Sequence, residues 1–265
     1  MQIGLIGCGN MGRALARGWR RPLLCADPIA ERARALADEV SGEALHSNIE
    51  VARRSDLLVL AHKPSQLGQV AAEVGGEAKA VASILAVTPL RALRDAFPDR
   101  PVYRFLPSLP VEVRQGAVVQ AVDAGAPPGR DSAGRPADAG RAPMDTAVSE
   151  LFAELGMLVE LDDALIDVAM GLMSCAPAYV ALVAEAQVDA GVRRGIPQSQ
   201  GAQLVVQTLA GTAELLRRRG YDMVSVRREV TSPGGLTARG LDALERGGMR
   251  AAFSDAMDAV LGQRA

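Results

Sequence analysis

A chain of 265 residues fits one large domain or two smaller ones, and it is long enough to bury a substantial core. The net charge is −2 and only 3% of the residues are aromatic, so the composition gives no sign of a nucleic-acid-binding surface. The three cysteines are scattered and lack the spacing of metal ligands, which predicts no metal site and favours a reducing, cytoplasmic compartment.

The first segment of the chain predicts a dinucleotide-binding turn. Residues 2–6 form a short apolar run typical of a buried strand, and a helical segment follows from Arg13. Between them, Gly7, Gly9 and Gly12 have the G-x-G-x-x-G spacing. The first glycine permits a tight turn, the second lets the backbone approach a pyrophosphate, and the third lets helix and strand pack closely. The start of the helix then offers N–H groups and a positive dipole end to the phosphate.

The second predicted strand, at residues 23–27, ends in an acidic residue. Asp27 lies about 20 residues beyond Gly7, where a carboxylate can bind the 2′-hydroxyl of an adenosine ribose. Because a carboxylate repels a 2′-phosphate, Asp27 favours NAD over NADP. Arg32 and Arg34 could instead attract a phosphate, although a solvated face of the predicted helix 28–39 explains them equally well.

Strands and helices alternate through the rest of the N-terminal half. A short helix begins at 47–50. His62, Lys63 and Pro64 follow the strand 57–61, at the edge where ligands of open α/β sheets bind. Lys63 is therefore a candidate ligand neighbour, whereas His62 is expected to be an ordinary loop residue. Further strands are predicted at 80–85, 101–106, 116–122 and 158–161, and helices at 89–96 and 145–155, with a surface loop over 123–143. This alternation predicts a parallel, doubly wound sheet.

From Asp162 onward no strand pattern recurs. The predicted helices cover 163–193, with a kink at Pro177, and then 198–219, 223–229, 237–246 and 249–262. The fold class is therefore α/β, with an N-terminal Rossmann-type doubly wound sheet over 1–161 and an all-α domain over 162–265. A helical half this apolar cannot bury itself alone, so we expect at least a homodimer.

One segment of the helical half, residues 168–184, has no charged residue and just reaches transmembrane length. Pro177 and several small residues favour a helix buried in a protein interface instead. The N-terminus lacks the basic residues of a signal peptide. We therefore predict no membrane span.

A second glycine motif, Thr231–Thr237, ends one segment and begins a helix. Gly234 and Gly235 leave backbone N–H groups uncovered, and the dipole of the helix that begins near Thr237 adds to them. Such a loop suits a small carboxylate or phosphate. The alternative is an ordinary helix start with Thr237 as its N-cap.

Both motifs closely resemble those of the pyrroline-5-carboxylate reductase family. The resemblance spans the chain in order, and its most specific block lies at residues 232–256. It rests on Gly7–Gly12, Asn48, Lys63-Pro64, Pro177-Ala178-Tyr179, Gln207-Thr208, Gly211, Ser232–Gly235, Thr237, Gly240, Leu244-Glu245, Gly247-Gly248, Arg250 and Ala256.

The resemblance implies a Rossmann domain joined to a helical dimerisation domain, assembled as a homodimer or a ring of dimers. It also implies reduction of the cyclic imine Δ1-pyrroline-5-carboxylate to proline, usually with NADPH, and NADH remains open as the cofactor. The implied cofactor-binding residues are Gly7, Gly9, Asn10, Met11, Gly12, Asp27, Asn48, Lys63 and Pro64. The implied substrate-binding residues are Cys175, Ser232, Gly234, Gly235 and Thr237, with the Thr237 hydroxyl bonding the ring nitrogen.

The sequence departs from the family pattern in three places: 106–110, 173–176 and 221–223. In the first, Leu106-Pro107-Ser108-Leu109-Pro110 stands where the family usually has Met-Pro-Asn-Thr-Pro, so an amide and a hydroxyl are lost. The substrate could therefore be another cyclic imine carboxylate. A β-hydroxyacid-type dehydrogenase would need a helical lysine, but the only lysines are Lys63 and Lys79. A non-catalytic NAD(P)-binding regulator is a third alternative, and a turnover assay distinguishes it.

Overall fold

The computed structural model describes residues 1–123 and 142–262. The chain forms two compact units, Met1–Cys175 and Ala176–Ala265. The units divide later in the chain than the sequence-based boundary at 161/162, because Ile166 and Ala169 pack against Leu106 in the core of the first unit. The first unit therefore includes the turns that follow its last strand.

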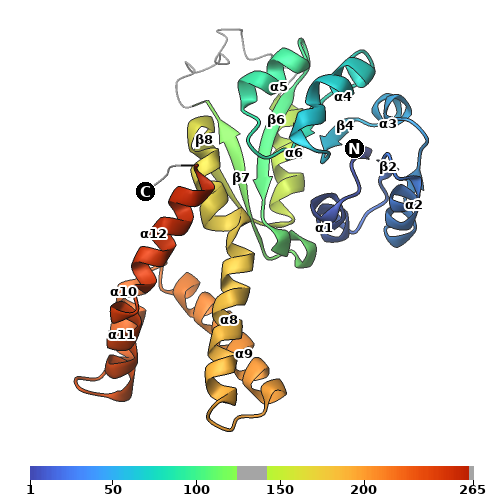
Figure 1. Ribbon diagram of the computed structural model, residues 1–265. Helices are drawn as coiled ribbons and strands as arrows, with labels where there is room; N and C mark the ends of the chain where they lie inside the picture. Colours follow the sequence, from blue (N-terminus) through green and yellow to red (C-terminus); the bar gives the residue numbers. More distant parts are fainter. Residues whose placement is uncertain (124–141, 263–265) are drawn as a thin grey trace. The chain divides into compact units, whose positions relative to one another are not determined.

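The first unit is built on one eight-stranded sheet with the order β3-β2-β1-β4-β5-β6-β7-β8. Strands β1 to β6 pair in parallel, as the alternating pattern predicts (Figure 1). The strands are β1 Ile3–Ile6, β2 Leu24–Ala26, β3 Glu43–Ala44, β4 Leu57–Leu60, β5 Val81–Ser83, β6 Val102–Pro107, β7 Gly116–Val122 and β8 Gly156–Asp162. The two-residue strand β3 is too short to show a sequence period, and it is absent from the predictions.

Strand β7 departs from the predicted all-parallel sheet. It runs antiparallel to β6, with Phe105 opposite Gln120, and β8 then pairs with it in parallel. Only the short 3₁₀ segment η2, Leu109–Val113, separates β6 from β7. A parallel pair needs a crossover of a dozen residues or more, so this short connection forces the chain to turn back.

Helices cover both faces of the sheet, which confirms the doubly wound arrangement. Alternate residues of each strand point to opposite faces: in β4, Leu57 and Val59 join one core, and Leu58 and Leu60 join the other. The helices α1 Asn10–Trp19, α2 Ala30–Glu39 and α6 Ala142–Ala153 contribute to the first core. The second is covered by α3 Asn48–Arg54, α4 Leu67–Val74 and α5 Leu90–Ala96. The predictions omit α4, and the predicted loop at 123–143 lies largely outside the described residues.

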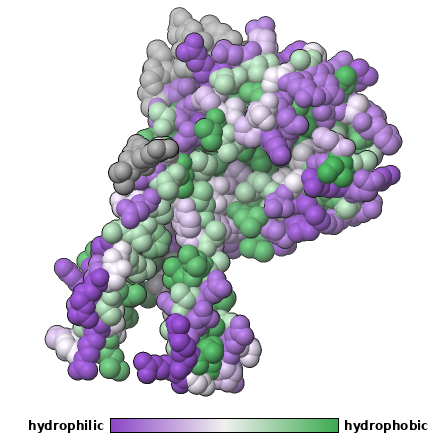
Figure 2. Space-filling view, viewed as in Figure 1, coloured by the Kyte–Doolittle hydropathy of each residue, from purple (hydrophilic) through white to green (hydrophobic). Residues whose placement is uncertain are grey.

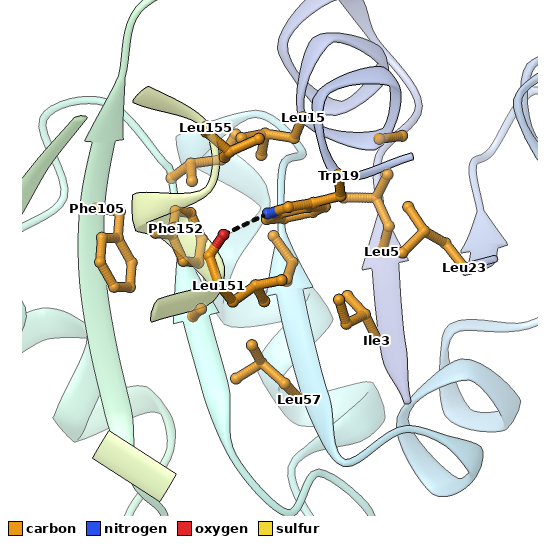
Figure 3. Packing of buried hydrophobic residues seen from close by; sticks show 14 of the residues in the cluster. Ile3, Leu5, Leu15, Trp19, Leu23, Leu57, Phe105, Leu151, Phe152 and Leu155 are labelled. Carbon is orange, nitrogen blue, oxygen red and sulfur yellow. Dashed lines mark hydrogen bonds between the residues drawn. The ribbon is translucent and has the colours of Figure 1, made fainter. Parts of the chain in front are cut away.

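The largest side chains of the first core meet between α1, β6 and α6 (Figure 3). The rings of Phe105 and Phe152 stack with centroids 3.7 Å apart, and Trp19 meets Phe152 edge-on at 5.4 Å. The indole N–H of Trp19 donates to the carbonyl of Leu151 at 2.9 Å, so the buried ring leaves no polar atom unpaired. This packing ties the C-terminal end of α1 to α6.

A buried ion pair fixes the turns after β8 against the sheet. The Arg104 side chain is 3% exposed and contacts Asp163 at 2.7 Å and Asp167 at 2.9 Å. The second oxygen of Asp163 accepts the N–H of Leu90, the first residue of α5, at 3.0 Å. These contacts hold the 3₁₀ turn η3, Asp163–Leu165, against β6 and the start of α5.

The region predicted as one kinked helix over 163–193 is divided. A single turn, α7 Ile166–Ala169, leads into a π-helical segment, η4 Met170–Ser174, and a separate helix, α8 Ala176–Val192, follows. Pro177 occupies the first turn of α8, where a proline needs no N–H donor. The remaining helices are α9 Gln198–Arg218, α10 Met223–Glu229, α11 Leu236–Arg246 and α12 Met249–Val260.

Large apolar side chains of the second unit lie exposed (Figure 2). Examples are Leu182, Leu204 and Val206, each at least 60% exposed. One helical stretch, Asp163–Val192, is long and apolar enough to cross a membrane by length and composition, with a mean hydropathy of 1.7 and 17% of its window buried. An exposed apolar surface of this kind is typical of a protein–protein interface or of a membrane contact.

Candidate dinucleotide site and anion-binding loop

The three glycines of the first motif differ in the space around them: Gly7 and Gly12 leave no room for a side chain, whereas Gly9 does. Gly7 has φ +103°, and a Cβ there would lie 2.6 Å from the Ala61 carbonyl at the end of β4. A Cβ on Gly12 would lie 2.2 Å from the Gly7 oxygen, so strand and helix are in direct contact. A Cβ on Gly9 would meet nothing within 4 Å. The space above Gly9 is open, which fits the close approach of a pyrophosphate.

Helix α1 begins at this loop without a side-chain cap. Gly9 is its N-cap, no side chain bonds its first N–H groups, and its first turn holds no acidic residue. The first intrahelical bond runs from Arg13 N–H to the Gly9 carbonyl at 2.9 Å. The N–H groups of Asn10, Met11 and Gly12 precede that bond and so have no partner within the helix. Together with the helix dipole, they make a site for an anion.

Asp27 lies at the end of β2 and faces the glycine loop. One carboxylate oxygen accepts the N–H of Cys8 at 2.8 Å, and the other accepts the N–H of Ile29 at 2.8 Å. These two bonds fix the position of the negative charge beside the pyrophosphate turn. Each oxygen keeps a lone pair for a ribose hydroxyl. Asp27 therefore has both a structural role, which the sequence did not indicate, and the predicted capacity to meet a ribose.

The residues after β4 lie at the same edge of the sheet. His62 Nδ1 donates to the Lys63 carbonyl at 2.9 Å, and its other ring nitrogen is buried without a partner among the described residues. Burial lowers the pKa of His62, so the ring is neutral at pH 7. The Lys63 side chain is exposed, and Pro64 begins the 3₁₀ turn η1, Pro64–Gln66. The structure thus places Lys63 at the predicted edge, and His62 donates one ring N–H within its own loop.

Asn48 begins α3, the helix whose start the sequence predicted. Ser47 is its N-cap, with the Ser47 hydroxyl accepting the N–H of Glu50 at 3.2 Å. The Asn48 amide donates to Glu73 on α4 at 2.9 Å. A contact between Asn48 and an adenosine ribose would have to share or replace that bond, and it stays a prediction.

The two buried cysteines near the loop serve packing. Cys8 and Cys25 are 1% and 0% exposed and belong to the same core. The neighbouring Cys25 thiol, together with burial, raises the pKa of Cys8, so this thiol stays protonated and unreactive. Cys175, predicted at the substrate, is half-buried between η4 and α8, and its role stays a prediction. Within residues 1–123 and 142–262, no cluster of three His, Cys, Asp or Glu residues could hold a metal ion.

At the end of β6 the structure explains one departure from the family pattern. The Ser108 hydroxyl accepts the N–H of Ala117 at 2.9 Å and donates to its carbonyl at 3.1 Å. Ser108 is therefore buried against β7 and offers no polar group to a ligand. The next residue, Leu109, is 46% exposed and presents an apolar side chain instead.

The second motif forms a tight turn followed by helix α11. Gly235 N–H donates to the Ser232 carbonyl at 3.1 Å, and Gly234 has φ +68°. Proline followed by a left-handed glycine in the middle of a four-residue turn is the type II pattern. A Cβ on Gly235 would lie 2.3 Å from the Ser232 hydroxyl, so this turn requires glycine at both positions.

Gly235, rather than Thr237, is the N-cap of α11. The helix begins at Leu236, one residue earlier than predicted, so Thr237 is its second residue and its side chain is exposed. No side chain caps the helix, and its first turn has no acidic residue. By contrast, Ser47 and Asp222 cap α3 and α10. Thus α11, like α1, starts at a glycine and leaves its first N–H groups available to an anion.

Sequence reasoning missed one unusual residue at the sheet edge. Val87 follows β5 and has φ +53°, a conformation that β-branched residues rarely adopt. No spacing or composition signal marks it, because a positive φ at a residue other than glycine depends on the folded loop rather than on residue type.

These features define a dinucleotide-dependent oxidoreductase with a Rossmann unit and a helical unit. Two family models match the chain: NADP oxidoreductase coenzyme F420-dependent at residues 2–87, and pyrroline-5-carboxylate reductase dimerisation at residues 163–264. The chain is 34% identical to pyrroline-5-carboxylate reductase of Thermus thermophilus and 32% identical to that of Synechocystis, over 98% of this chain and 96% of each relative. The chain belongs to the pyrroline-5-carboxylate reductase family.

Solved structures agree with this assignment. The enzyme of Streptococcus pyogenes matches with a TM-score of 0.84 at 25% identity, covering 99% of this chain and 97% of that one. Plasmodium falciparum pyrroline carboxylate reductase with NADP bound matches with a TM-score of 0.82 at 25% identity, over 98% and 95% of the two chains. The helical region carries the family's dimerisation domain, so the exposed apolar helices are explained by a homodimer.

Proposed function

We propose that the protein reduces the cyclic imine Δ1-pyrroline-5-carboxylate to proline, using NADPH, with NADH as an alternative donor. The observation that carries this proposal is the pair of glycine-capped helices. Helix α1 offers unpaired N–H groups beside an open glycine, which suits a pyrophosphate. Helix α11 offers a second such set after a tight turn, which suits a carboxylate. A substrate with one carboxylate and a dinucleotide cofactor needs one site of each kind.

The proposed cofactor fits the residues that the structure holds. The loop Gly7–Gly12 would bind the pyrophosphate, Asp27 and Asn48 would lie at the adenosine ribose, and Lys63 and Pro64 would border the cofactor. When bound, NADPH supplies a hydride to the imine carbon. The chain itself needs to hold the two reacting planes together and to exclude water.

The proposed roles in the second unit concern the substrate. The turn from Ser232 through Gly234 and Gly235 would bind the carboxylate through the first N–H groups of α11. The Thr237 side chain is exposed, so its hydroxyl is available to orient the ring nitrogen or to pass it a proton. Cys175 would contact the substrate. We further propose a cytoplasmic enzyme whose dimers can assemble into a ring.

A second candidate substrate is a different cyclic imine carboxylate, and the end of β6 favours it. The buried Ser108 hydroxyl and the exposed Leu109 make this part of the edge less polar than the family pattern implies. A larger or more apolar ring would suit such a surface, while the carboxylate loop would stay unchanged.

The test measures NADPH and NADH consumption by the purified full-length protein with a panel of cyclic imine carboxylates of five- and six-membered rings. Fastest turnover with pyrroline-5-carboxylate supports the first proposal. Turnover with another imine alone would transfer the assignment to the second. Cofactor binding without turnover of any imine would contradict both and favour a regulatory protein.

A further inference from the structure

Two of the segments that depart from the family pattern lie close together, although they are far apart in the sequence. One is the end of β6, from Leu106 to Pro110, and the other begins at Met173 in η4. Met170 and Met173 pack against the buried cluster that contains Leu106. The two changes therefore meet at one place in the first unit.

This place lies at the carboxyl edge of the sheet. Strand β6 pairs in parallel with β5, β5 with β4, and β4 with β1, so all four strands end at the same edge. The glycine loop follows β1 at that edge, where ligands of open α/β sheets bind. In the order β1-β4-β5-β6, the end of β6 is the farthest of the four from the glycine loop. It is thus placed to border a substrate rather than the pyrophosphate.

At the end of β6 a polar side chain turns inward and an apolar one stays exposed. Ser108 is 3% exposed, and its hydroxyl bonds both the N–H and the carbonyl of Ala117. The next residue, Leu109, is 46% exposed. Leu109 therefore gives this part of the edge an apolar surface.

The segment η4 adds adaptable apolar side chains to the same place. The N–H of Cys175 donates to the carbonyl of Met170 at 3.0 Å, and this bond across five residues makes the turn π-helical. Such turns are rare and occur frequently at functional sites. Met170 and Met173 are half-buried, and methionine side chains adjust their shape to apolar neighbours.

We propose that Leu109 and Met173 are specificity-determining residues that form an apolar wall against the substrate ring. This assignment rests on the proposed function and deepens it by naming the class of imine: a cyclic imine carboxylate whose ring carries no further polar group. An apolar wall gains buried area from an added methylene. It leaves an added ring hydroxyl without a hydrogen-bond partner.

The test uses two compounds that each differ from pyrroline-5-carboxylate by a single heavy atom. One is the six-membered homologue, which adds a methylene, and the other is the ring-hydroxylated derivative. Because the added groups are similar in size, the ratio of kcat/KM for the homologue over the hydroxylated compound reports the polarity of the wall. With the native full-length protein this ratio should be about 10 or more.

Variants of the two wall residues should change the ratio in one direction. Leu109→Thr supplies a hydroxyl at an exposed position, so the variant should fold, and it should lower the ratio about 10-fold. Met173→Ser should lower the ratio as well. Met173→Leu keeps the position apolar and should preserve the native ratio.

A matched control is Val113→Thr. Val113 is 62% exposed at the end of η2, in the same connection between β6 and β7, so the variant makes the same kind of change away from the strand end. It should leave the ratio at the native value. A native ratio below 1 would overturn the proposal, as would an unchanged ratio in both Leu109→Thr and Met173→Ser or an equal fall in Val113→Thr. No turnover of any of the three imines by the native protein would instead contradict the proposed function itself.

Discussion

Asp27 shows how one side chain can carry both a structural and a selective role. Its two oxygens accept the N–H groups of Cys8 and Ile29, each at 2.8 Å, so its charge cannot turn away from a 2′-phosphate. Asp27→Ser should shift the ratio of kcat/KM for NADPH over NADH toward NADPH by about 1–2 kcal/mol, because it removes a charge that repels the phosphate. Steady-state kinetics with both cofactors measure the ratio.

The matched variant is Asp27→Asn. It removes the charge but keeps one side-chain oxygen as an acceptor for a backbone amide. It should shift the ratio in the same direction while losing less stability than the serine variant. If the ratio of kcat/KM for NADPH over NADH is unchanged in both variants, Asp27 only stabilises the loop through its hydrogen bonds.

Thr237 is open to a test that separates chemistry from capping. Because Gly235 is the N-cap of α11, the Thr237 hydroxyl is not needed to start the helix. Thr237→Ala should therefore melt close to the native protein. Its kcat/KM should fall roughly 10- to 200-fold, since it loses a hydrogen bond to a charged or polar group worth about 1.5–3 kcal/mol. Thr237→Ser keeps the hydroxyl and should lose much less. Normal kcat/KM in the alanine variant would remove Thr237 from the site.

At the scale of an element, the turn between β1 and α1 contains one glycine that the fold requires and one that only the ligand is expected to require. Gly9→Ala should fold normally, because its Cβ meets no atom within 4 Å. It should bind NADPH at least 10-fold more weakly, because the methyl group occupies the space of the pyrophosphate. Gly12→Ala should be strongly destabilised, since its Cβ would lie 2.2 Å from the Gly7 carbonyl oxygen. Melting curves and cofactor titrations distinguish the two. A Gly9→Ala protein with native NADPH affinity would show that the pyrophosphate lies elsewhere.

At the scale of the whole molecule, the helical unit depends on a second copy. Phe253 on α12 is 48% exposed and lines a pocket with the apolar Leu241, Leu244 and Met249 and the charged Arg227, Glu245 and Arg250. Phe253→Asp should yield monomer or insoluble protein, because a charge on this face opposes burial in the dimer. Light scattering measures the mass in solution. Ser254→Asp, an exposed neighbour on the same helix, is the control and should remain dimeric. A folded Phe253→Asp protein of dimeric mass would exclude this face from the interface.

Much of the architecture follows from local pattern alone. The glycine spacing from Gly7 to Gly12 predicted a dinucleotide turn, and in the structure Gly7 and Gly12 have a steric reason while the space at Gly9 is open. The alternation of apolar strands and amphipathic helices predicted a doubly wound sheet, because strands buried on both faces must be covered on both. The excess of apolar residues in the helical half predicted association, and the family's dimerisation domain confirms it.

Contacts between residues far apart in the chain decided the rest. Only the fold shows that Asp27 accepts the N–H of Cys8 and that the Ser108 hydroxyl accepts the N–H of Ala117 in β7. Only the fold shows that Val87 has a positive φ. The sequence by itself determined which segments form strands, helices and anion-binding turns, because those depend on residue spacing and backbone preference. The tertiary structure decided which polar groups are used up internally and which remain for ligands, because hydrogen-bond partners and steric room depend on neighbours that sequence spacing does not reveal.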